Sequence, residues 1–227
     1  MNINKHLIPL VCVLFFLFAV SVSSGCFRKN ESDVKSVVRN ELDQLKNLDS
    51  ETTQKYIPYT ELFPDATENT DLTDEINETF SLFFRKFNYK ISDVIVGTAN
   101  HSATVSVKLT TIDSKVLARD FKAELLRTQI TESAQAQKGN IKDSSRSLEA
   151  HYLILNHLLN TNDYDTAETD CNIQLVNTGN DKKEKWKIQR TNSLEDDLVG
   201  GLIADLANPD ILSPEDTLTV YLDTLQK

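Results

Sequence analysis

The stretch SATVSVKLTTIDSKVLARDF, from Ser102 to Phe121, decides the fold, because its hydropathy pattern changes once along its length. Apolar side chains first alternate with polar ones, which is typical of a strand with one buried face. After Asp113, whose side chain is suited to cap a helix, the pattern becomes helical. The stretch therefore predicts a half-buried strand that leads directly into a helix. The side chains expected on the buried face of the strand are Ala103, Val105, Val107 and Leu109.

The segment YKISDVIVG before this strand predicts its antiparallel partner. Its apolar positions change phase, because Tyr89 and Ile91 fall out of step with Val94 and Val96. A β-bulge at Ser92–Asp93, which inserts one extra residue into the strand, would explain the shift. The two segments together predict an antiparallel hairpin with one solvated face.

Three segments before this hairpin have helical periodicity. Ser32 is suited to cap the first helix. A short helix of about Thr52–Ile57 ends before Pro58, and a third helix spans about Thr73–Phe87. Four phenylalanines on one face of the third helix predict a face in the core. The first helix is expected to carry the apolar stripe Val34, Val37, Val38, Leu42, Leu45 and Leu48.

The sequence after the helix that follows Asp113 predicts another helix, a second hairpin and a leucine-rich helix. The first of these spans about Ser147–Leu159, and the turn NTGNDKKE separates the two strands. Trp186, on the last strand with Ile188, is expected to be buried against the helices. Ser193 is a candidate cap for the leucine-rich helix. The expected inward side chains are Thr169, Cys171, Ile173 and Leu175 on the strand and Leu194, Leu198, Leu202 and Leu206 on the helix.

This order of elements is typical of an α+β fold whose sheet is covered by helices on one side. Two stretches, HSATVSVKLTTIDSKVLARDFKAELL and NIQLV…KEKWKIQRTNSLEDDLVGGL, resemble a family of Gram-positive bacterial lipoproteins with a domain of unknown function. The resemblance covers about residues 31–206. It implies the cystatin-like (nuclear-transport-factor-like) cone, a curved antiparallel sheet built from two hairpins covered by helices. It implies no established activity.

Residues 1–25 are typical of an export signal, here a lipoprotein signal peptide. Their apolar run LIPLVCVLFFLFAV is too short to span a bilayer of roughly 30 Å as a helix. The small residues before Cys26 resemble the bacterial lipobox, which implies that Cys26 receives a diacylglycerol and becomes the N-terminus. Residues 26–30 would then be a membrane tether. Ser23 stands where leucine is usual, so plain secretion remains an alternative, as does a retained membrane anchor.

The acidic composition limits the classes of binding partner, and the number of cysteines limits the disulfide bonds that can form. A net charge of −10 disfavours binding to nucleic acid, because phosphate backbones are repelled. Cys12 lies within the signal and Cys26 is the lipid site, so Cys171 is left without a partner for an internal disulfide. Its setting among alternating apolar residues predicts a small buried thiol.

Catalytic and metal-binding signatures are not evident. His151 and His157 are six residues apart on one helix, so they do not form an i,i+4 metal pair. Asp93 and Asp113 adjoin inward strand positions and are the candidate acids of a cone pocket. A bulge and a helix cap explain them better. The expectation is no catalytic residue, no metal and no cofactor.

The C-terminal part, residues 207–227, predicts a linker and a helix. Ser213 and Pro214 form a start signal, and an apolar stripe is expected to bury itself against the domain. The segment YLDTLQK also echoes ELDQLKN in the first helix, so a remnant of a tandem domain and a strap for a partner are alternatives. The stripe consists of Leu218, Leu222 and Leu225.

The function expected from these patterns is a non-catalytic binding or interaction module. It would be lipid-anchored through Cys26 on the extracytoplasmic face of the cell membrane. A protein partner and a small apolar ligand both remain open, as does the oligomeric state. The alternatives are an enzyme with a buried carboxylate in a cone pocket, and an assembly protein that dimerises through its sheet or C-terminal helix.

Overall fold

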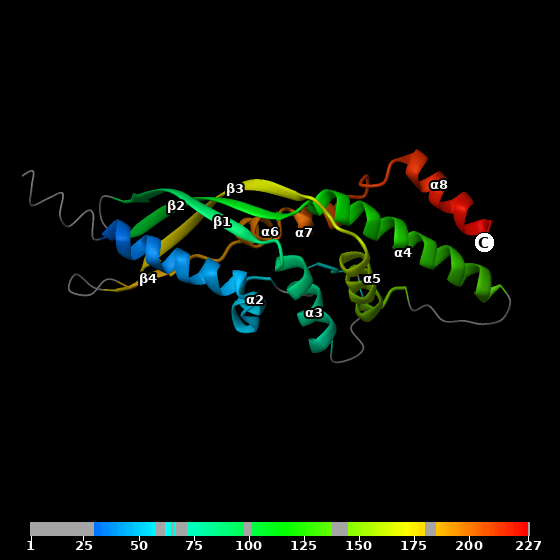
Figure 1. Cartoon of the computed structure of the whole chain (residues 1–227), viewed down its shortest axis with the longest axis horizontal. Helices are drawn as coiled ribbons and strands as arrows, with labels where there is room; N and C mark the ends of the chain where they lie inside the picture. Colours follow the sequence, from blue (N-terminus) through cyan, green and yellow to red (C-terminus); the bar gives the residue numbers. More distant parts are fainter. Residues whose placement is uncertain are drawn as a thin grey trace, which may run out of the picture.

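Four antiparallel strands form an open, curved sheet in the order β1-β2-β3-β4, with helices against one face (Figure 1). The computed structural model describes residues 30–57, 62–64, 66, 72–97, 101–137, 145–179 and 185–226. The predicted α+β class and the two antiparallel hairpins are confirmed. The strands are β1 Asn88–Val96, β2 Ser102–Ile112, β3 Thr166–Asn177 and β4 Trp186–Ile188.

The two faces of the sheet differ as the alternation predicts. The inward side chains of β2, from Ala103 to Leu109, are all buried, and Trp186 on β4 is only 6% exposed. The outward side chains pair across strands in water, so this face is polar. The cross-strand pairs are Thr104 Oγ1 with Gln174 Oε1 at 2.9 Å, Ser106 Oγ with Asn172 Oδ1 at 2.9 Å, and Lys108 Nζ with Glu168 Oε2 at 3.1 Å.

The bulge in β1 is confirmed. The register of β1 against β2 shifts between Ile91 and Asp93, which leaves Ser92 outside the ladder. The Ser92 hydroxyl donates to the backbone oxygen of Ser106 at 3.0 Å. The shift returns the later apolar residues of β1 to the inner face, where Val96 is buried.

The helices pack on the inner face and beyond one end of the sheet (Figure 1). A first helix covers residues 30–46, and α3 packs against α5. The long α4 continues away from the sheet and contacts α5, α7 and α8. The labelled helices are α2 Ser50–Tyr56, α3 Thr73–Phe84, α4 Ser114–Ala136, α5 Leu148–Thr161, α6 Asn192–Leu198, α7 Leu202–Ala207 and α8 Pro214–Leu225.

The predicted helix caps are confirmed in some places and wrong in others. Asp113 caps α4 as expected, and Ser147, which was expected to be the first residue of its helix, is instead the cap of α5. Ser32 lies inside the first helix, which is already formed at residue 30, so it is not the cap. Thr191, not Ser193, caps α6, and its side chain accepts from the backbone nitrogen of Leu194 at 3.1 Å.

Leu48 does not belong to the buried stripe of the first helix. It follows the helix in a turn, with a φ of 61°, and is 42% exposed. The prediction that the buried stripe extends to Leu48 is therefore wrong. The earlier members of the stripe are buried, namely Val34, Val38, Leu42 and Leu45.

The leucine-rich segment forms two helices rather than the single helix expected. Gly200 and Gly201 separate α6 from α7, with φ values of 65° and 90°. Left-handed backbone at two successive residues ends α6 and redirects the chain. The predicted leucines are nevertheless all buried, namely Leu194, Leu198, Leu202 and Leu206.

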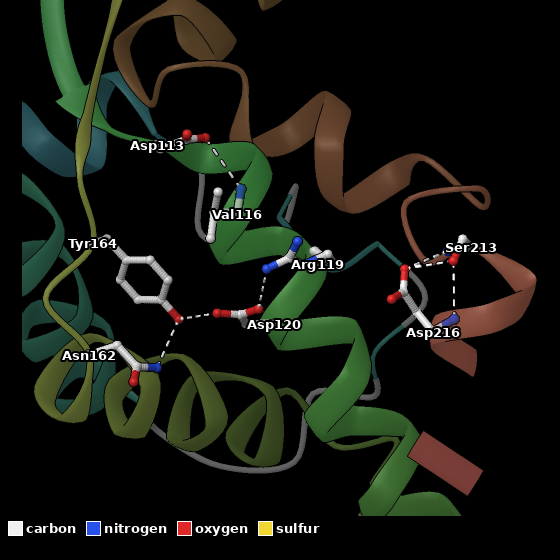
Figure 2. Close-up of polar contacts among 8 residues, drawn as sticks. All are labelled: Asp113, Val116, Arg119, Asp120, Asn162, Tyr164, Ser213 and Asp216. Atoms are coloured by element: carbon white, nitrogen blue, oxygen red, sulfur yellow. Dashed lines mark hydrogen bonds and ion pairs between the residues drawn. The ribbon is translucent and has the colours of Figure 1, made fainter. Parts of the chain in front are cut away.

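The C-terminal helix α8 lies along α4, but the face of α8 that is buried is not the one expected. Its capping box is present, because Ser213 Oγ accepts from Asp216 N at 3.0 Å and Asp216 Oδ2 accepts from Ser213 N at 3.2 Å (Figure 2). Val220 is the buried side chain of α8, all of which lies in the described residues. The leucine stripe is exposed, so its predicted burial is wrong. The exposed fractions are 58% for Leu218, 48% for Leu222 and 58% for Leu225.

We predict that Gly200→Ala destabilises the protein much more than Gly201→Ala. Both changes place a side chain on left-handed backbone, at a cost of about 1–2 kcal/mol. A Cβ on Gly200 would also lie 2.2 Å from Thr111 Oγ1, whereas a Cβ on Gly201 meets its nearest atom at 3.7 Å. Overpacking adds about 1–3 kcal/mol at Gly200 alone. Urea unfolding measures the two losses.

The double variant Gly200→Ala with Thr111→Ala identifies the cause. Removing Thr111 Oγ1 removes the shortest contact, so part of the lost unfolding free energy should return. Equal losses in the two glycine variants, with no recovery in the double variant, would contradict the steric explanation.

Candidate functional site

A hollow with a volume of about 630 Å³ lies between α4, α5, α7 and the residues Leu62, Phe63, Pro64 and Ala66. We call it the cleft. Fourteen described residues line it, and nine of them are apolar. They are Leu62, Phe63, Pro64, Ala66, Phe121, Lys122, Leu125, Gln129, Ser145, Arg146, His151, Ile203, Leu206 and Ala207.

Local sequence rules place each wall of the cleft. The cap at Asp113 sets the first turn of α4, so Phe121, Leu125 and Gln129 follow at spacings of four on one face. The Ser147 cap likewise begins α5 one turn before His151. The third wall, α7, is directed by the glycine pair after α6.

His151 lies in an aromatic setting inside the cleft. Its ring centroid is 4.8 Å from that of Phe63 and 5.6 Å from that of Phe121. Nδ1 is 2.7 Å from the backbone oxygen of Ser147, a carbonyl that can only accept. The proton of the neutral ring is therefore on Nδ1, which leaves Nε2 as an acceptor.

The pKa of His151 is lowered. Burial of the ring is the main cause, and the bond to Ser147 opposes it, while the charge of Lys122 lowers the pKa further. The ring therefore stays neutral near pH 7.

Aromatic rings pack against one another in one wall of the cleft. Phe63 and Phe121 are stacked with centroids 5.1 Å apart, and Phe63 meets Tyr152 edge-on at 5.5 Å. Such pairs contribute about 0.5–1.5 kcal/mol each beyond their burial. The aromatic wall is thus preformed, as the walls of small-molecule sites usually are.

Among the described residues that line the cleft, the charged side chains are basic. The fourteen lining residues include Lys122 and Arg146 but no aspartate or glutamate. The chain as a whole has 34 acidic and 24 basic side chains, so this local balance is opposite to the overall one. The cleft is therefore an apolar space with a basic contribution.

Two smaller hollows lie along the first helix and β1, with volumes of about 300 and 400 Å³. Their linings are mostly polar or charged, as at Lys35 and Asp43. They offer little apolar area to a ligand, so the cleft is the better candidate site.

The residues singled out in the sequence lie elsewhere. Cys26 is outside the described residues. Cys171 is buried on β3, where burial and the neighbouring Asp197 carboxyl raise its pKa to about 12, so the thiol keeps its proton. Asp93 is exposed beside the bulge, and Asp113 accepts from Val116 N (Figure 2). Neither aspartate lines the cleft.

The part of the chain that the structure describes has no group of three or more His, Cys, Asp or Glu placed to hold a metal ion. Within the same residues, no helix has both the length and the hydropathy needed to cross a bilayer. Comparisons with models of protein families, with curated proteins and with solved structures found no match.

We predict that His151 makes stability fall as the pH falls. Its pKa is lowered in the folded state, so below the usual value of about 6.5 the unfolded chain binds the proton more readily. Its contribution is fully present above that value and is lost below it. Unfolding free energies measured at about pH 7.5 and about pH 5.5 give the slope.

The variant His151→Phe keeps an aromatic ring and removes the titration, so the slope should become shallower. His157→Phe, at an exposed position on the same helix, is the matched control and should keep the wild-type slope. An unchanged slope in His151→Phe would contradict the role of burial.

Proposed function

We propose that this protein is a lipid-anchored, non-catalytic binding module that holds a small apolar ligand in the cleft. The volume of the cleft carries the proposal: about 630 Å³ lies within the range of roughly 300–1,000 Å³ typical of small-molecule sites. Its aromatic and aliphatic walls supply the apolar contact area that such a ligand needs.

The sequence before the domain supports an anchor at Cys26, with the protein on the extracytoplasmic face of the cell membrane. Residues 26–30 would form a short tether between the lipid and the domain. Two lipid chains or more on Cys26 would give stable attachment, since each buried methylene contributes about 0.8 kcal/mol.

The proposed fold family is the cystatin-like cone of the Gram-positive lipoproteins that the sequence resembles. A curved antiparallel sheet with one face covered by helices supports this assignment (Figure 1). The cleft does not lie against that sheet. Its described walls come from α4, α5, α7 and the residues Leu62, Phe63, Pro64 and Ala66, and none of the described lining residues lies on a strand.

An enzyme with a buried carboxylate in its pocket is the weaker alternative, because it would need that carboxylate in the cleft. The described residues that line the cleft supply none, and His151 donates from Nδ1 to a backbone carbonyl rather than to a carboxylate. Binding requires only the apolar walls that are present.

Assembly through α8 is the second candidate, and its exposed stripe favours it. Leu218, Leu222 and Leu225 are each about half exposed, and Tyr221 beside them is 48% exposed. The polar outer face of the sheet makes dimerisation through that face less favourable. A sedimentation mass of two chains would favour assembly over ligand binding alone.

We predict that the full chain binds the uncharged fluorescent probe N-phenyl-1-naphthylamine in the cleft. The variant Leu125→Trp fills the space between α4 and α7 and should abolish most of the fluorescence increase. Leu153→Trp is the matched control, because Leu153 is 52% exposed and does not line the cleft. Equal binding by both variants would place the probe elsewhere.

We predict that Cys26→Ala releases the protein from membranes or leaves an uncleaved precursor, because the thiol that carries the lipid is lost. Cys171→Ala is the control, since that thiol is buried in the domain. Fractionation with immunoblotting measures the distribution. A Cys26→Ala protein that lacks residues 1–25 and still sediments with membranes would contradict the lipid anchor.

A further inference from the structure

We propose that the open edge of β1 binds an extended, acidic peptide segment of a protein partner, which adds to the sheet as a fifth strand. β1 is the first strand in the order β1-β2-β3-β4, so it has a neighbouring strand on one side only. The edge shares none of its described lining residues with the cleft. It is therefore a second site, and it does not depend on the ligand proposed for the cleft.

The ladder between β1 and β2 identifies the backbone groups that face the open side. Gly97 N donates to the backbone oxygen of Ser102 at 2.9 Å, so Ser102 and every second residue after it on β2 bond to β1. The residues of β1 that lie opposite the other β2 residues direct their N–H and C=O groups away from β2. These open residues are Tyr89, Ile91, Val94 and Val96.

The main chain of the open residues is unpaired on that side. Within the part of the chain that the structure describes, none of the four has a backbone hydrogen bond to anything beyond the open edge. A row of such N–H and C=O groups is a template for pairing with another strand. Where a peptide extends a sheet in this way, the main-chain hydrogen bonds supply the affinity.

The first helix lies beside β1 and forms the second wall of the site (Figure 1). Tyr89 Oη donates to Asp43 Oδ1 at 2.5 Å, which holds the helix against the strand. The two smaller hollows lie between them, and both are lined by Lys35 and Ile91. We call these adjoining hollows the edge groove. Inward side chains of an added strand would lie over this groove.

The helix directs a basic stripe to one end of the edge groove. Lys35, Arg39 and Lys46 line the hollow at the beginning of β1, and Asp43 is the acidic side chain among the described lining residues there. Asp43 already accepts from the Tyr89 hydroxyl. The side chains of Lys35 and Arg39 have no ion pair or hydrogen bond within the protein as described.

An acidic peptide residue matches this end of the edge groove. The described residues that line it all belong to the stretches 30–57 and 72–97, each of which is described without a gap. An aspartate or glutamate would give Lys35 and Arg39 the counter-charge that they lack. Because surface ion pairs contribute little, the charge sets a preference among peptides that the main chain holds.

A second copy of this chain fits the edge less well. Because of the bulge between Ile91 and Asp93, antiparallel pairing joins all four open residues only when Ile91 of one copy lies opposite Val94 of the other. That register brings the two Asp93 side chains close to the symmetry axis. Like charges that face each other across strands are destabilising. A peptide whose acidic residue lies at the other end of β1 avoids this repulsion.

The test uses the full chain and a phage-displayed library of random nonapeptides, because β1 has 9 residues. Selected peptides should carry an aspartate or a glutamate near one end. Their affinities are measured by fluorescence anisotropy with the synthetic peptides. N-methylation of alternate amide nitrogens should abolish binding in one phase and leave it unchanged in the other, because only one edge of the added strand faces β1.

The variant Val94→Pro tests the edge of the protein. The Val94 N–H faces the open side, so proline removes an edge donor and leaves the β1–β2 ladder in place. Peptide affinity should fall by roughly tenfold. Asp170→Pro is the matched control on the other side of the sheet. Gln174 O accepts from Gln189 N, so Asp170, four residues earlier on β3, also directs its N–H away from β2. This control should keep the wild-type affinity, and urea unfolding checks that both variants fold.

A charge variant locates the acidic residue of the peptide. Arg39→Gln should weaken binding by roughly twofold to fivefold, the effect expected for a surface ion pair. The loss should shrink when the peptide acid is replaced by its amide. Lys187→Gln is the matched control, because Lys187 is exposed on β4 and does not line the edge groove.

Three results would overturn the proposal. A library that yields no binder, or binders that respond neither to Val94→Pro nor to the phase of N-methylation, would exclude the edge as a peptide site. Selected peptides rich in lysine or arginine would exclude the acidic class. A sedimentation mass of two chains that falls to one in Val94→Pro would identify a second copy as the occupant of the edge.

Discussion

The junction between β2 and α4 is the constraint on which the arrangement depends. Asp113 N donates to the backbone oxygen of Asp165 at 2.9 Å, which ties the junction to the chain just before β3. Ser114 Oγ donates to the backbone oxygen of Gly200 at 2.6 Å, which ties it to the turn between α6 and α7. Because one residue separates strand from helix, the direction of β2 limits where α4 can lead. These contacts therefore fix the positions of the sheet, α4 and the α6–α7 turn relative to one another.

The cleft follows from the way α4 leaves the sheet. Its first turns are buried, at Leu117, Ala118 and Phe121, and the helix packs against α5, α7 and α8. Asp120 accepts from the Tyr164 hydroxyl at 3.2 Å on one side of α4, and Arg119 lies nearer α8 (Figure 2). Beyond those first turns, Leu125 and Gln129 on the same face of α4 border the cleft opposite residues of α5 and α7. The apolar lining left open there is the physical basis of the proposed site.

Local patterns predicted the parts of the fold that local physics determines. The strands, the bulge in β1 and the caps Asp113 and Ser213 follow from alternation, from a phase shift and from short polar side chains next to free backbone nitrogens. The errors arose where tertiary contacts choose between local options. Thr191 and Ser193 are both good caps, and the break at Gly200 depends on its close approach to Thr111, far away in the sequence.

The cleft could not be predicted, because its walls come from segments that no periodicity connects. Phe63 and Arg146 lie in loops, and only the fold brings them to the face of α4 that carries Phe121. The same separation has an energetic consequence. An unfolded chain has no cleft, so a ligand of the cleft binds the folded state alone and stabilises it, by about 2.7 kcal/mol at a hundred times its dissociation constant. The apolar lining lowers the stability of the folded protein while the cleft is empty, and a bound ligand would reverse that effect. The amount of folded protein would then depend on the concentration of the ligand.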